Sequence, residues 1–138
     1  MKKKAIIISI KSTTLTSKEK LLLAKEKPWG LILFKRNIKS SIQTKRLINN
    51  IRNYTKDKKF PILIDEEGFS VSRLRDIFNH NVNANYFGNL YKINKKIAVN
   101  LYKSYLRSLS EELKKLGINV NTIPVLDILR QNTNSVIG

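Results

Sequence analysis

The stretch Pro61-Ile62-Leu63-Ile64-Asp65-Glu66-Glu67-Gly68 places aliphatic residues directly before a carboxylate and ends in a glycine. Residues 30–37 (GLILFKRN) and 117–127 (GINVNTIPVLD) also place an apolar run before polar or charged residues. Short Val, Ile and Leu runs separated by helix-length amphipathic stretches indicate βαβ units and a parallel sheet buried on both faces. In such sheets the functional groups lie at the carboxyl ends of the strands. The sequence therefore predicts an α/β fold with its chemistry where these runs end.

The predicted strands are parallel and follow one another in sequential order. Their expected ranges are residues 5–10, 31–34, 62–65 and 119–125. A helix capped by Thr16 or Ser17 is expected over residues 18–25, with Glu19 in its first turn, where the helix dipole favours an anion.

Two further helices are predicted by apolar residues that recur at helical spacing. The first would begin at Ser40 or Ser41 and face the sheet with Ile42, Leu47, Ile48 and Ile51. The second would end at Gly117 and carry an apolar face of Ala98, Leu101, Leu106, Leu109 and Leu113. Residues 66–94 lack clear periodicity and are rich in asparagine, which predicts a long loop.

The net charge of +17 raises an alternative function, a small basic non-catalytic binding protein for nucleic acid or an anionic surface. Its distribution argues against a nucleic-acid partner, because the basic residues are mostly lysines spread along the chain without interleaved aromatic residues. The chain has no cysteine and one histidine, so we expect neither a metal site nor a thiol nucleophile.

The N-terminal Lys2-Lys3-Lys4 and the apolar residues after it resemble the start of a signal peptide. That apolar run ends at Lys11 and no small-residue cleavage site follows, so it is better explained as the first strand. No segment approaches the ~20 apolar residues that span a bilayer. We therefore expect a cytoplasmic protein without membrane contact.

Three segments in order, GLILFKRNI, PILIDEEGFSVSRL and LGINVNTIPVLD with the later NSVIG, resemble the N-terminal half of bacterial family 3 glycoside hydrolases. The preceding TLTSKEKLLLAKEKPWG is also similar, so the resemblance runs from about Ser12 to Gly138. It implies a β-N-acetylhexosaminidase that removes N-acetylglucosamine during peptidoglycan recycling, without a cofactor.

A complete (β/α)8 TIM barrel needs about 250 residues. The 138 residues would supply about four β/α units, a partial barrel forming a single domain over residues 1–138 that is truncated at its C-terminus. A separately encoded C-terminal half would then be a partner.

The resemblance implies that Asp65 and Arg73 bind the sugar. They match the first aspartate and last arginine of the family's Asp-Gln-Glu-Gly-Gly-Arg-Val-Gln-Arg motif, while Phe69, Ser70 and Ser72 depart from it. From the residues alone, Asp65 could instead pair with a nearby lysine or cap the loop. Arg73 could also form a structural ion pair with Asp76 or Glu67, or hold Asp65 itself.

Arg36 and Asn37 also match the family, and we expect a structural role for them as an ion pair or loop anchor at the barrel mouth. Asp127 matches the family's Pro-Val-Leu-Asp pattern, and we expect it to have a structural role or to orient a neighbouring cation. His80 matches no catalytic motif and is interpreted as a surface histidine. The family's acid/base histidine–aspartate pair and its nucleophilic aspartate match nothing in this chain. We therefore predict no catalytic residue in it and no activity of the chain alone.

Overall fold

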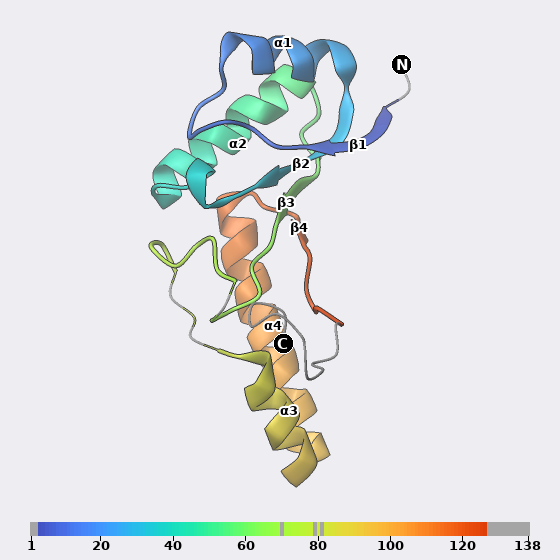
Figure 1. Cartoon of the computed structure of the whole chain (residues 1–138), viewed down its shortest axis with the longest axis vertical. Coiled ribbons are helices and arrows are strands. Elements are labelled where there is room, and N and C mark those ends of the chain that lie inside the picture. The colour runs from blue at the N-terminus through green and yellow to red at the C-terminus, as the bar shows by residue number, and fades with distance from the viewer. Residues whose placement is uncertain (1–2, 70, 79, 81, 127–138) are drawn as a thin grey trace, which may run out of the picture.

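Four strands, β1 (Lys4–Ile8), β2 (Pro28–Leu33), β3 (Ile62–Ile64) and β4 (Val120–Asn121), form a parallel sheet in sequential order (Figure 1). The computed structural model describes residues 3–69, 71–78, 80 and 82–126. The helices are α1 (Ser17–Glu26), a short 3-10 turn (Lys35–Asn37), α2 (Ser41–Thr55), α3 (Ala84–Ile93) and α4 (Lys95–Leu116). The α/β class and the parallel, sequential sheet are confirmed, while β4 is shorter than predicted.

The central strands carry the core. In β2 and β3 the side chains of Leu31, Leu33 and Ile64 are completely buried, as expected for strands covered on both faces. The outer strand β1 differs, because Ile6 is 52% exposed and Ile7 is 44% exposed. The prediction of burial on both faces is therefore wrong for β1, which lies at an edge of the sheet within the described residues.

Side-chain caps define where the first two helices begin. Thr16 and Glu19 form a reciprocal capping box at α1, and the Ser40 side chain accepts a hydrogen bond from the backbone of Gln43 at α2. In α2, Leu47, Ile48 and Ile51 are buried as predicted. Ile42 is 82% exposed, because at about 100° per residue it lies on the opposite side of the helix from them.

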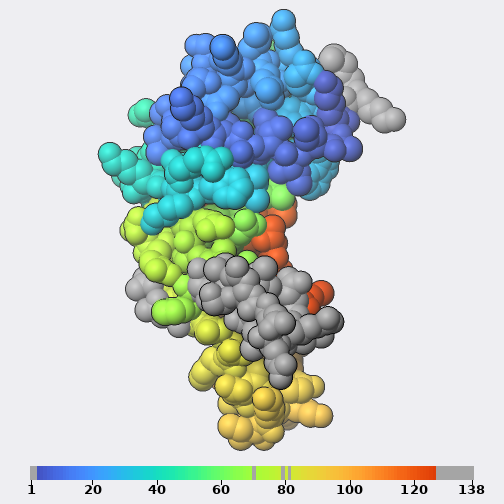
Figure 2. Space-filling model, in the orientation of Figure 1, coloured from blue at the N-terminus to red at the C-terminus, as the bar shows by residue number. Residues whose placement is uncertain are grey.

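The predicted long loop at residues 66–94 is interrupted by a helix. Asn83 caps α3, and Asn94 both ends α3 and caps α4, so the two helices form a hairpin. The rings of Phe87 on α3 and Tyr102 on α4 pack edge to face at 4.8 Å. Figures 1 and 2 show this hairpin projecting away from the sheet. The loop prediction is wrong here because packing against α4 stabilises a segment of weak helix propensity.

The long helix α4 joins the hairpin to the sheet. Its C-terminal half packs into the core with Leu109, Leu113 and Leu116, and it ends at Gly117, whose φ is 94°. Its first half leaves the core, so Leu101 is exposed although the spacing places it on the apolar face. No helix in the described part of the chain has both the length and the apolar character to span a membrane.

Candidate functional site

The carboxyl end of β3 places Asp65 beside groups from two other segments. The Thr122 hydroxyl, just after β4, donates a hydrogen bond of 2.9 Å to Asp65 Oδ1. Arg73 Nη2 lies 3.7 Å from Asp65 Oδ2, and the two side chains are 29% and 25% exposed, respectively. The sheet therefore brings Asp65 and Arg73 together at its carboxyl edge. Of the alternatives left open by the sequence, the ion pair that the structure gives for Arg73 is the one with Asp65.

The guanidinium of Arg73 also faces an aromatic ring. It lies 5.9 Å from the centre of the Phe34 ring, and Arg36 lies 4.7 Å from the same ring. Arg73 Nε is buried, and no hydrogen-bond partner for it is found in the part of the chain that the structure describes. Arg73 thus presents a guanidinium that its protein contacts only partly satisfy.

Arg36 and Asn37 form hydrogen bonds to the segments that follow the neighbouring strands. Arg36 donates from Nε to the Ile10 carbonyl and from Nη2 to the Ser9 hydroxyl, both at 3.0 Å. Asn37 is fully buried and donates to the carbonyls of Ile10 (3.1 Å) and Ser12 (2.9 Å). Its Oδ1 accepts the backbone N–H of Phe34 at 2.9 Å. These contacts tie the segment after β1 to the segment after β2.

The turn after Asp65 departs from the family motif, and one of its described residues has a positive φ. That residue is Gly68, whose φ is 131°. Phe69 is 57% exposed, and its backbone N–H donates to the Val82 carbonyl at 3.2 Å. Ser72, which stands where the family motif has glutamine, contributes to lowering the pKa of the Glu66 carboxyl.

His80 is buried, so its interpretation as a surface histidine is wrong. His80 Nε2 lies 2.7 Å from Glu66 Oε1, and the Tyr105 hydroxyl lies 2.9 Å from His80 Nδ1. The Phe78 ring stacks on the imidazole at 5.2 Å. The loop folds back across α4 and carries the histidine inside, which local sequence does not reveal. Glu66, Thr122 and Tyr105 were missed for the same reason, since each gains its role only through a contact distant in sequence.

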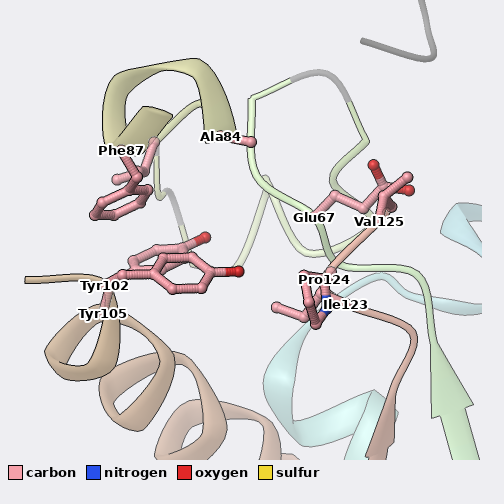
Figure 3. Close-up of a pocket in the computed structure, with 9 residues that line it drawn as sticks. Glu67, Ala84, Phe87, Tyr102, Tyr105, Ile123, Pro124 and Val125 are labelled. Atoms are coloured by element: carbon pink, nitrogen blue, oxygen red, sulfur yellow. The ribbon is translucent and has the colours of Figure 1, made fainter. Parts of the chain in front are cut away.

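A hollow lies beside this edge of the sheet (Figure 3). Phe87, Tyr102 and Tyr105 form its wall on the hairpin side, and Glu67, Ile123, Pro124 and Val125 lie across from them. The tyrosine hydroxyls point toward the hollow (Figure 3). Burial raises the pKa of Tyr105 to about 12, with further contributions from Glu66 and Tyr102, so this hydroxyl keeps its proton.

The remaining predictions concern Asp127 and metal binding. Asp127 falls outside the described residues, and so does the prediction that it shares an end of the sheet with Asp65. Among the described residues, no group of three or more His, Cys, Asp or Glu side chains is arranged to hold a metal ion.

The chain is similar to bacterial β-hexosaminidases along most of its length. It is 32% identical over 133 residues to the β-hexosaminidase of Nitrosomonas eutropha. The matched region covers 96% of this chain and 38% of that protein. The chain thus spans well under half the length of the curated relatives that it matches. No family model matches it.

Solved structures show the same similarity to part of a β-hexosaminidase. NagZ from Neisseria gonorrhoeae, in complex with N-trifluoroacetyl-D-glucosamine, superposes with a TM-score of 0.84 at 29% identity, covering 91% of this chain and 36% of NagZ. A fungal multi-domain GH3 β-N-acetylglucosaminidase gives a TM-score of 0.76 at 27% identity, covering 96% of this chain and 16% of that protein.

Proposed function

We propose that this chain, a homologue of the N-terminal part of the glycoside hydrolase family 3 β-hexosaminidases, provides part of the sugar-binding surface of an enzyme that removes N-acetylglucosamine from peptidoglycan fragments. The proposed setting is the cytoplasm, and the reaction needs no cofactor. The relatives are much longer, so we also propose that further β/α units complete the barrel, whether they belong to the same polypeptide or to a separately encoded half.

The observation that carries this proposal is the Asp65–Arg73 pair at the carboxyl end of β3. A carboxylate accepts hydrogen bonds from sugar hydroxyls, and a guanidinium donates to hydroxyl or carbonyl oxygens. Both side chains are partly exposed, and their nitrogen and oxygen atoms are 3.7 Å apart, longer than a hydrogen bond, so a ligand can reach both groups.

The hydrolytic groups are proposed to come from outside residues 1–138. A retaining glycosidase needs a nucleophilic carboxylate and an acid/base group on the two sides of the scissile bond. Asp65 is engaged by Arg73 and Thr122, and Glu66 is fully buried in a hydrogen-bond network. The contacts of Asp65 support a binding role for it, and the complete burial of Glu66 supports a structural role.

Binding can be tested with N-trifluoroacetyl-D-glucosamine, whose fluorine signal reports weak association by NMR. We expect a Kd on the order of 1–10 mM, because one wall of a site provides few contacts. Asp65→Asn should weaken binding about tenfold, the effect of losing one charge-assisted hydrogen bond. Asp76→Asn is the matched control, because Asp76 pairs with Lys35 on the surface. Equal affinities in wild type and Asp65→Asn would refute the proposed site.

Two further measurements separate this function from its rivals. The chain alone should not hydrolyse an aryl N-acetylglucosaminide, and turnover abolished by a substitution within residues 1–138 would contradict this. Sugar binding should change little between 50 and 200 mM salt, whereas charge-driven binding to DNA falls roughly 10³-fold or more when several phosphates are contacted. A steep salt dependence of the sugar signal would count against recognition by Asp65 and Arg73.

A further inference from the structure

A carboxylate without any exposed surface, that of Glu66, lies directly behind the sugar-binding pair. Its Oε2 accepts the backbone N–H groups of Arg73 at 2.7 Å and Leu74 at 2.9 Å. Its Oε1 lies 2.7 Å from His80 Nε2. A buried charge is costly unless it is well satisfied, and here both carboxylate oxygens are engaged. The buried charge of Glu66 is thus stable only while all of these hydrogen bonds are formed.

The charge of this group is maintained by those partners. Burial acts to raise the pKa of the Glu66 carboxyl. Hydrogen bonds from His80 and Ser72, and from two backbone N–H groups, outweigh burial and hold the pKa below its ordinary value. Glu66 is therefore an acceptor at neutral pH, and His80 Nε2 must carry the proton between them.

The same residue connects three parts of the structure. Its backbone N–H donates to Asn121 Oδ1, and its carbonyl accepts from Asn121 Nδ2, both at 3.0 Å, which fixes it to β4. Its carboxylate holds the backbone of Arg73, and its neighbour in sequence is Asp65. Through His80, the Tyr105 hydroxyl links the carboxylate to α4. Both members of the sugar-binding pair are therefore placed by one residue.

We propose that Glu66 is a positioning residue that, held by His80 and Tyr105, sets the backbone of Arg73 and so keeps its guanidinium beside Asp65. Effects on sugar binding follow only if the proposed function holds. Glu66 contacts no substrate in this scheme. Its isosteric replacement by glutamine keeps the shape but removes the charge, and one amide cannot offer acceptors to both His80 and the backbone N–H groups.

The test compares Glu66→Gln with Glu112→Gln, a control in which the lost carboxylate pairs with Lys115 on the surface of α4. Glu66→Gln should speed amide hydrogen exchange about tenfold at Arg73 and Leu74, the size expected for a lost charge-assisted hydrogen bond. The backbone N–H of Ile51 in α2 should exchange at the wild-type rate. N-trifluoroacetyl-D-glucosamine should bind severalfold more weakly, and Glu112→Gln should change none of these quantities.

Every result of this comparison either supports or overturns the positioning role of Glu66. Unchanged exchange at Arg73 in a folded Glu66→Gln chain overturns the proposal, and so does faster exchange with wild-type sugar affinity. If Glu66→Gln does not fold, Tyr105→Phe, which keeps the carboxylate but removes its link to α4, is judged by the same two measurements. If wild type does not bind the sugar, the proposed function fails, and exchange at Arg73 alone decides whether Glu66 positions it.

Discussion

Gly68 in the turn after Asp65 allows one substitution to be worked out from geometry. Its φ of 131° is strained for any residue with a side chain, and an added Cβ would lie 2.2 Å from the Val82 carbonyl oxygen. That oxygen also accepts the backbone N–H of Phe69 at 3.2 Å. Gly68→Ala therefore cannot be accommodated by a side-chain rotation, and the backbone on one side of the turn must move.

The expected cost is the sum of two effects. A residue in a sparsely populated backbone conformation costs about 1–3 kcal/mol, and a displaced hydrogen bond adds about 1 kcal/mol. Gly68→Ala should thus lower the free energy of unfolding by about 2–4 kcal/mol. The matched substitution Gly88→Ala should raise it by about 1 kcal/mol, because an added Cβ there meets nothing within 4 Å and alanine is the better helix former in α3.

Urea denaturation followed by circular dichroism measures both changes. Since the turn joins Asp65 to Arg73, Gly68→Ala should also weaken binding of N-trifluoroacetyl-D-glucosamine, whereas Gly88→Ala should not. A Gly68→Ala chain within about 0.5 kcal/mol of wild type, the range of ordinary surface substitutions, would refute the strain at this turn.

Three further predictions concern stability and association. The pKa of the Glu66 carboxyl is lower in the folded chain than its ordinary value of 4.5, so ionised Glu66 stabilises the fold above about pH 4.5. This stabilisation is lost as the pH falls through the folded pKa. The difference in free energy of unfolding between wild type and Glu66→Gln should therefore shrink below about pH 4.5 in acid titrations. Asn37→Ala removes hydrogen bonds to three backbone groups, of which the Ile10 carbonyl keeps its bond from Arg36, and should cost about 2–3 kcal/mol in urea denaturation; Asn50→Ala, at an exposed position of α2, should change stability by less than about 0.5 kcal/mol. The exposed Ile6 and Ile7 of β1 should promote self-association, visible as elution in size-exclusion chromatography that shifts with concentration; one monomeric peak at every concentration would contradict it.

The features predicted correctly from sequence depend on local patterns or on the register of parallel strands. The helix cap at Thr16 is a short-range feature, and the ends of β2 and β3 follow directly from apolar runs. Because parallel strands end at one edge, placing the strands also placed the residues that follow them at that edge.

The features missed depend on contacts between distant segments. His80 lies in an asparagine-rich stretch with no apolar period, yet Tyr105 and Glu66 hold it inside the fold. The helix α3 exists because Phe87 packs on α4, and the exposure of Ile6 depends on which strand lies at the edge. None of these can be read from neighbouring residues, because each is decided by tertiary packing.

The α3–α4 hairpin and the sheet contact the Asp65–Arg73 site through different hydrogen bonds. Asn121 and Asn37 bind backbone groups in the segments that follow the strands, those of Glu66 and of Ile10, Ser12 and Phe34, and none of these groups belongs to α3. Among the hydrogen bonds described for the site, the link from α4 is the one from the Tyr105 hydroxyl through His80 to Glu66. Changes at the far end of the hairpin should therefore leave the Asp65–Arg73 pair intact, whereas changes at Tyr105 should reach Arg73.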